Sequence, residues 1–165
     1  MAGVRGVTTE IYQCRGVVFD ITVSLATIDH MKKNAHPAHA ACPCDSGQPY
    51  ADCCGTWHAG LALGQHAPTP EALMRSRYSA YVIGLLDYLL ATWHASSSPG
   101  DLELPPVKWL GLEVRHAQTA GDAGVVEFVA RCKEGGRAQR MHETSRFVRE
   151  DGRWYYIDGQ MTESE

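Results

Sequence analysis

Apolar residues in the second half of the chain recur first at helical spacing and then in strict alternation. Between Pro70 and Gly84 the apolar side chains lie three or four positions apart, which predicts an amphipathic helix. Thr69 provides a capping hydroxyl before Pro70, and Gly84 is suited to end the helix. A second, shorter helix is predicted over residues 86–93. The apolar positions behind these predictions are Met74, Tyr78, Tyr81, Val82 and Leu85 in the first helix, and Leu86, Leu89, Leu90 and Trp93 in the second.

Beyond a predicted loop at 96–106, the apolar period changes to two. This alternation predicts four strands, over residues 110–115, 125–132, 139–149 and 154–158, with turns at 133–137 and 150–153. The expected inward faces are Leu110, Leu112 and Val114; Val126, Phe128, Ala130 and Cys132; and Met141, Glu143, Ser145 and Phe147. Helices followed by an antiparallel meander indicate an α+β fold with the helices on one face of the sheet.

Composition limits the classes of protein to consider. The 165 residues, 44% hydrophobic and 21% charged, suit one soluble domain with a small additional module. A net charge of −4 makes a general nucleic-acid binder unlikely, because such proteins carry a basic surface. Residues 17–28 are apolar but too short to span a membrane, and Lys32 and Lys33 follow them, unlike the order in a signal peptide. We therefore expect a cytoplasmic protein.

The first forty-one residues carry the weakest pattern. We expect residues 1–41 to form a poorly ordered extension. Met31 opens a plausible alternative start, so residues 1–30 are hypothesised to be an artefact of start-site choice. The intact mass of the native protein tests this hypothesis, and a mass that includes residues 1–30 would refute it.

Four of the six cysteines fall within the segment CPCDSGQPYADCCGTWH, residues 42–58. Cys42 and Cys44 form one close pair, Cys53 and Cys54 form another, and the breaker residues 45–49 between them can reverse the chain. Two close pairs at the ends of a turn can supply the four ligands of a structural zinc ion. Disulfides and unrelated reduced thiols are the alternatives, and the tight spacing favours metal over both.

The fourth ligand of this predicted zinc knuckle has two candidates. Cys54 is the direct one and is preferred. His58 lies four residues further on, so it would share a helical face with Cys54 and is held in reserve.

The pattern CPC-x-SG-x-x-Y-x-x-CC resembles the SEC-C motif, a small zinc-binding module. Downstream, the segments LMRSRYSAYV, DYLLATWH, VKWLGLEV, GVVEFVARCKEGG and HETSRFVREDGRWYYIDG resemble the uncharacterised bacterial YchJ family. The resemblance implies a SEC-C knuckle at 42–59, a linker at 60–69 and a domain similar to nuclear transport factor 2 at 70–160. The chain departs from the family at Asp45, where glycine is usual, and it has no second SEC-C motif near its end.

The resemblance also implies a cone-shaped sheet closed by helices around a pocket. The ionisable and polar residues that could line it are Arg75, Tyr78, Tyr81, His94, Glu143 and Asp158. Such groups could assemble a general acid/base site. The alternative is structural, with Glu143 or Asp158 paired to Arg77 or Arg146, because buried charges are normally paired.

Two functions follow from these patterns. The favoured one is a non-enzymatic, zinc-binding adaptor whose knuckle contacts a protein partner, as the resemblance to the SEC-C segment of SecA, which contacts the SecB chaperone, implies. The other is a binder of small molecules, or an isomerase-like or hydrolase-like enzyme, that uses the conical pocket. A homodimer formed through the larger domain is compatible with either.

Overall fold

The computed structural model describes residues 36–104 and 106–162. The hypotheses about residues 1–30 therefore lie outside the described residues. Helical segments come first: the 3-10 helix η1 (Tyr50–Asp52), α1 (Cys54–Gly60), the 3-10 helix η2 (Leu61–Leu63), α2 (Pro70–Ile83) and α3 (Leu86–Ala91). The strands follow: β1 (Lys108–Ala120), β2 (Ala123–Glu134), β3 (Arg137–Glu150) and β4 (Arg153–Met161). This order confirms the predicted α+β class.

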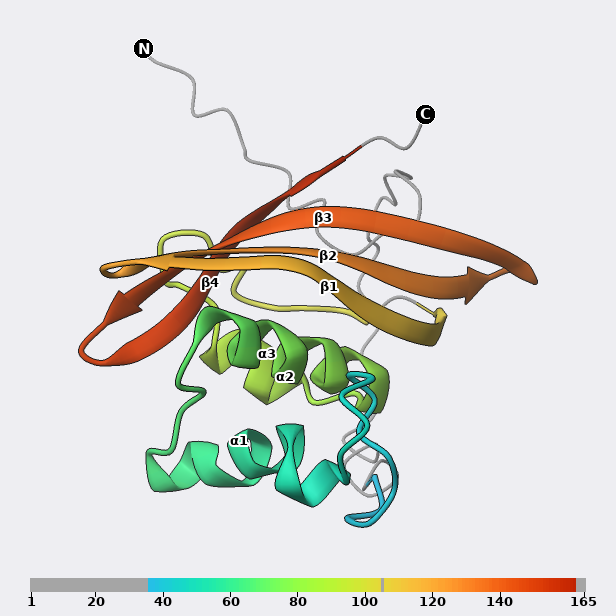
Figure 1. Cartoon of the computed structure of the whole chain (residues 1–165), viewed down its shortest axis with the longest axis horizontal. Coiled ribbons are helices and arrows are strands. Elements are labelled where there is room, and N and C mark those ends of the chain that lie inside the picture. Colours follow the sequence, from blue (N-terminus) through green and yellow to red (C-terminus); the bar gives the residue numbers. More distant parts are fainter. Residues whose placement is uncertain (1–35, 105, 163–165) are drawn as a thin grey trace.

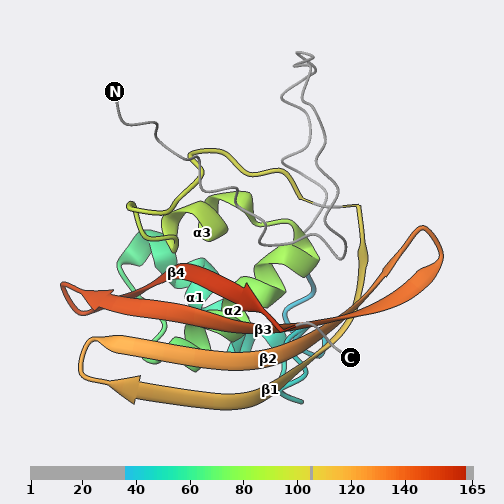
Figure 2. The ribbon, with the colours of Figure 1, turned by 90° about the horizontal axis from the view of Figure 1, so that it is seen from above.

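These elements form layers, as Figures 1 and 2 show. The four-stranded sheet lies on one side, α2 and α3 cover one of its faces, and α1 lies beyond α2 (Figure 1). Helix α2 is therefore sandwiched between the sheet and the cysteine-rich segment. None of the described helices is long and apolar enough to cross a membrane.

Helix α2 begins and ends where its local sequence predicts. The Thr69 hydroxyl accepts a hydrogen bond from the Ala72 backbone N–H at 3.1 Å, and Gly84 takes the left-handed conformation, φ 81°, that stops the helix. Its burial differs from the amphipathic expectation: Ser76 and Ser79 are buried, whereas Val82 is exposed. A helix packed on two sides buries polar positions too, so the apolar stripe alone was a poor guide.

The sheet is an antiparallel meander in the order β1-β2-β3-β4. Each strand is longer than predicted, because two-residue turns such as Gly135–Gly136 and Asp151–Gly152 let pairing continue almost to the hairpin tip. Both residues of each turn have positive φ, the conformation that this type of turn requires. The predicted inward faces of β2 and β3 are confirmed as buried.

Strand β1 contains a bulge that the alternation did not reveal. Pairing with β2 shifts register between Trp109 and Gly111, and Gly111 has φ 155°. Leu110 is consequently 45% exposed while Leu112 is buried, so the predicted inward position of Leu110 is wrong. The extra residue of a bulge moves a side chain to the other face of the strand.

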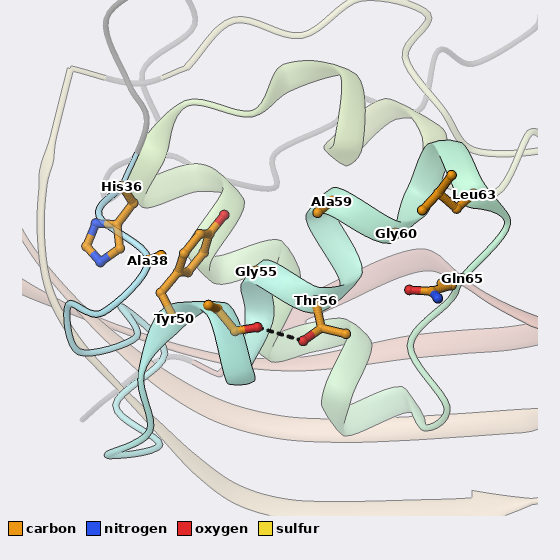
Figure 3. Close-up of a pocket in the computed structure, with 10 residues that line it drawn as sticks. His36, Ala38, Tyr50, Gly55, Thr56, Ala59, Gly60, Leu63 and Gln65 are labelled. Atoms are coloured by element: carbon orange, nitrogen blue, oxygen red, sulfur yellow. Dashed lines mark hydrogen bonds between the residues drawn. The ribbon is translucent and has the colours of Figure 1, made fainter.

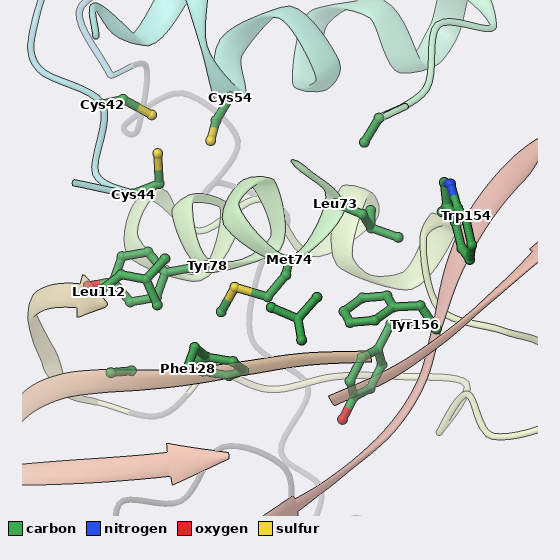
Figure 4. Packing of buried hydrophobic residues seen from close by; sticks show 14 of the residues in the cluster. Cys42, Cys44, Cys54, Leu73, Met74, Tyr78, Leu112, Phe128, Trp154 and Tyr156 are labelled. Carbon is green, nitrogen blue, oxygen red and sulfur yellow. The ribbon is translucent and has the colours of Figure 1, made fainter. Parts of the chain in front are cut away.

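The main core lies between α2 and the sheet (Figure 4). Met74 and Tyr78 from α2 meet Phe128 and Leu112 from the sheet, while Tyr156 and Trp154 of β4 lie toward the other end of the helix. Cys42, Cys44 and Cys54 lie on the opposite side of α2 and belong to the same buried cluster. The cysteine segment and the sheet thus share one core.

Candidate metal centre

The first pair of cysteines lies at the start of a tight chain reversal. The Cys42 N–H bonds to the Gln48 carbonyl at 2.8 Å, and Ala41 pairs with Pro49 across the turn. Two residues within it, Asp45 and Gly47, have positive φ, which lets the chain turn in so short a length. The predicted reversal at 45–49 is confirmed.

The second pair comes from the next two elements. Cys53 follows η1, and Cys54 begins α1, so both thiols lie where the chain turns from one short helix into the other. The four sulfur atoms of Cys42, Cys44, Cys53 and Cys54 lie within 4.8 Å of one another. Figure 4 shows Cys42, Cys44 and Cys54 directed toward one another above α2.

The spacing of the sulfurs fits a tetrahedral ion. Metal–sulfur bonds of about 2.3 Å imply sulfur–sulfur edges of about 3.8 Å. The Sγ atoms of Cys44 and Cys53 are 3.6 Å apart, and those of Cys53 and Cys54 are 3.9 Å apart. Four free thiols, three of them buried, therefore form a closed donor set with the chemistry and size of a structural metal site.

Without a metal, these thiols compete for protons. Hydrogen bonds from Cys44 and Cys54 lower the pKa of Cys42, while the hydrogen bond to Cys42 raises the pKa of Cys44 to about 11. The pKa of Cys54 is raised as well, first by its hydrogen bond with Cys42 and then by that with Cys44. A bound cation would replace these shared protons, so metal binding must release protons.

Polar groups around the thiols support the site. The Ser79 hydroxyl lies 3.7 Å from the sulfur of Cys42, and the Ser46 hydroxyl lies 3.2 Å from that of Cys53. The guanidinium of Arg75 donates to the Cys44 carbonyl at 3.1 Å, which brings positive charge toward the thiol cluster. Such outer partners orient ligands and tune a metal site, and cysteine spacing alone did not identify them.

His58, the reserve ligand, lies outside the group of four sulfurs. Its Nδ1 lies 2.7 Å from the Tyr50 hydroxyl, and its Nε2 lies 2.9 Å from the Ser76 carbonyl oxygen. Burial lowers the pKa of His58, and its ring packs edge-on against Tyr88. The Nε2 contact therefore joins α1 to α2, and the Nδ1 contact joins α1 to η1.

Asp45 ties the cysteine loop to the sheet. Its carboxylate accepts a hydrogen bond from the Leu112 N–H at 2.9 Å, just after the β1 bulge. A Cβ on Gly111 would lie 2.7 Å from the same carboxylate oxygen and 2.6 Å from Nη2 of Arg131. The bulge and its glycine therefore make room for this contact between loop and sheet.

The residues expected to line a conical pocket occupy different environments. Arg75 forms an ion pair with Glu71 and reaches the cysteine loop, while Tyr78 packs edge-on against Trp109. His94 pairs with exposed Glu150, and the carboxylate of Asp158 pairs with exposed Arg146, which confirms one of the predicted structural pairs. Tyr81 and Glu143 are buried.

A surface pocket of about 450 Å³ lies on the cysteine-rich module (Figure 3). The pocket is lined by the small residues Ala51, Gly55 and Ala59, which lie four positions apart on η1 and α1, and by Tyr50 and Leu63. This pocket was not among the predicted sites, although the repeated small residues were a usable signal. Part of the predicted linker 60–69 is helical, and its Leu63 is 79% exposed.

Together these features define an α+β protein with two parts. One is an antiparallel sheet covered by helices, and the other is a module with four clustered cysteines of the kind that can bind a metal ion. Residues 40–56 match the SEC-C motif, and residues 69–159 match the YchJ middle NTF2-like domain. The chain belongs to the YchJ-like family of UPF0225 proteins, as the sequence resemblance predicted.

Relatives and solved structures agree with this assignment. A UPF0225 protein of Chromobacterium violaceum is 58% identical over 134 residues, which cover 77% of this chain and 97% of the relative. A UPF0225 protein of Bordetella bronchiseptica is 56% identical over 133 residues, covering 78% and 98%. The solution structure of a SEC-C motif-containing protein from Rhodopseudomonas palustris matches with a TM-score of 0.66 at 36% identity, covering 75% of this chain and all of that one.

Proposed function

We propose that this protein is a zinc-binding adaptor whose cysteine module holds a protein partner. The observation that carries the proposal is the donor set: four thiols lie within 4.8 Å of one another, and the two sulfur–sulfur distances of 3.6 and 3.9 Å are close to the edge of a tetrahedral zinc site. Zinc is the metal that such a closed set of four thiolates suits best among common cellular ions. The ion would fix the ends of a loop too short to build a core of its own.

The surface pocket supports a binding role for this module. Tyr50 lines the pocket and lies between the two pairs of metal-binding cysteines, so zinc would hold that wall in place. Leu63 presents an exposed apolar side chain at the same pocket. A concave site beside an exposed apolar residue fits a protein partner that inserts an apolar side chain.

The metal proposal is tested by zinc content and thiol titration of the full chain, purified without chelator. We expect about one zinc per chain, and four thiols that become reactive only when the zinc is removed. Cys42→Ser should lose the zinc. Metal-free protein in which Cys42, Cys44, Cys53 and Cys54 all react freely would overturn the proposal.

Partner binding is tested by affinity capture with zinc-loaded protein, zinc-stripped protein and two surface variants. Leu63→Glu adds a charge at the pocket, whereas Leu110→Glu adds the same charge at an exposed position on β1. We expect capture of a specific protein to be lost with Leu63→Glu and on zinc removal, and kept with Leu110→Glu. Capture that is indifferent to both zinc and Leu63 would argue against the adaptor role.

A further inference from the structure

A group of buried polar side chains lies between the helices and the sheet, away from the metal centre. Arg77 of α2, Trp93 after α3, Glu143 of β3 and Tyr156 of β4 make up this inner polar cluster. Each side chain is no more than 3% exposed. The proposed adaptor function uses none of these residues.

Arg77 is the centre of the cluster. Its Nη1 donates to the Leu89 carbonyl and to the Thr92 hydroxyl, both at 2.7 Å. The rings of Trp93 and Tyr156 lie 5.1 and 4.6 Å from the guanidinium carbon. Its Nε and Nη2 have no hydrogen-bond partner among the described residues. These two donors share one edge of the guanidinium, the edge that binds a carboxylate through two parallel hydrogen bonds.

The other members present unpartnered polar atoms as well. Glu143 accepts a hydrogen bond from Ser145 at 2.6 Å through Oε1, but its Oε2 has no partner within the described chain. The same holds for the Tyr156 hydroxyl and the Trp93 indole N–H. Nearly all buried polar groups in proteins are hydrogen-bonded, so such a concentration of them points to a ligand that they complement.

The position of Glu143 is fixed by the backbone behind it. A Cβ on Gly159 of β4 would lie only 2.0 Å from Oε1 of Glu143, so the carboxyl lies directly against a residue without a side chain. Arg77 is near enough to lower the pKa of Glu143, yet no ion pair joins the two side chains in the described structure. The guanidinium edge and the carboxyl are therefore separate groups that one bridging molecule could contact.

We propose that the inner polar cluster binds a small carboxylate anion on the Nε and Nη2 edge of Arg77. The guanidinium supplies a bidentate hydrogen-bonding edge, and Glu143 in its protonated form, the Tyr156 hydroxyl and the Trp93 indole supply further donors. Because all four side chains are almost fully buried, we expect only a small ligand, of about the size of acetate. A large or doubly charged anion such as phosphate would have to be buried with too little compensating charge.

The charge of the cluster suits a monoanion near neutral pH. Burial raises the pKa of Glu143 to about 7. Below that pH the carboxyl is protonated and neutral, so it does not balance the positive charge of Arg77. The other ionisable groups that act on the cluster are Tyr81 and Asp158. Asp158 is paired with Arg146 and has a lowered pKa, so its charge stays constant over this range. Binding should therefore weaken as pH rises through about 7.

The test is a titration of the full chain with acetate against chloride at equal ionic strength, in a buffer without carboxylates. The readout is the NMR resonance of the Arg77 Nε–H, which a bidentate anion must shift. We expect a saturable shift, weaker at pH 8 than at pH 6. Arg77→Lys keeps the charge but loses the planar edge, and should lower the affinity at least roughly tenfold.

Two further variants keep the outcome interpretable. Tyr156→Phe removes a single hydroxyl and should weaken acetate binding even if Arg77→Lys fails to fold. Arg146→Lys makes the same exchange in an exposed ion pair and should leave the affinity unchanged. The proposal is overturned if acetate shifts the Arg77 resonance no more than chloride does, or if binding survives both Arg77→Lys and Tyr156→Phe.

Discussion

The carboxyl of Glu143 is placed where ionisation is costly. Its side chain is 1% exposed, and burial raises its pKa from an ordinary value of 4.5 to about 7, against the opposing effects of Ser145 and Arg77. The folded protein therefore holds this proton over a range in which the unfolded chain has lost it. The stability that this retained proton provides is present below the unfolded-state pKa and is lost as pH rises through about 7.

Glu143→Gln should remove this pH dependence. The amide keeps the shape of the side chain and cannot ionise. As the pH rises from 5 to 8, the unfolding free energy of the variant should therefore increase relative to that of the wild type. A rise of the Glu143 pKa from 4.5 to about 7 corresponds to a change of about 3 kcal/mol in the difference between the unfolding free energies of the two proteins. Urea unfolding at both pH values, in buffers without carboxylates, measures it. A difference that is the same at pH 5 and pH 8 would show that Glu143 does not titrate in this range.

Among the elements, α2 is the one on which the others are assembled. It packs against α1 on one side and against β1, β2 and β4 on the other. Its ends are defined locally, by the Thr69 hydroxyl at the first turn and by left-handed Gly84 after the last. Because the cysteine module and the sheet both rest on this helix, fraying at either end should weaken the whole fold.

Thr69→Ala should therefore cost about 1 kcal/mol of unfolding free energy, since it removes the hydrogen bond to the Ala72 N–H. Thr119→Ala, an exposed position near the end of β1, is the matched control and should change stability by less than about 0.5 kcal/mol. Chemical denaturation monitored by circular dichroism compares the two variants. Equal losses from both would mean that the cap contributes nothing specific.

Local sequence signals predicted the elements that depend on local chemistry. The ends of α2 follow from Thr69 and Gly84, and the hairpins follow from their glycine-containing turns. The β1 bulge could not be predicted in this way, because it accommodates Asp45 and Arg131, which are distant from it in sequence. Tertiary contacts of this kind override the alternation of a single strand.

The same distinction applies to the candidate sites. The clustering of the four cysteines was predicted from their spacing alone, because a set of donors on one short loop is a local pattern. The sequence did not predict the inner polar cluster as a group, although it indicated Glu143 as a pocket residue and Arg77 as a structural partner. The members of the cluster come from two helical regions and two strands, which local patterns do not relate to one another.

At the scale of the whole molecule, the cysteine module is joined to the larger domain by specific contacts. Arg75 reaches the Cys44 carbonyl, and Asp45 accepts from the Leu112 N–H. The sulfur of Cys42 lies against Ser79 of α2. Residues 42–45 of the cysteine loop thus contact both α2 and β1, so a change in the conformation of this loop should alter the stability of β1.

Removal of the metal should therefore destabilise the entire chain. If the free zinc concentration is about a thousand times the Kd of the site, removal of zinc should lower the unfolding free energy by roughly 4 kcal/mol. The Leu112 amide should exchange hydrogen faster after chelation, because its acceptor, Asp45, follows the candidate metal ligand Cys44. The amide of Val126, in the middle of the sheet, should change less. Acid should have the same effect as chelator, because thiolates regain protons as pH falls. Thermal unfolding and hydrogen exchange measure both effects. Unchanged exchange at Leu112 after complete zinc removal would show instead that the cysteine module and the sheet are energetically independent.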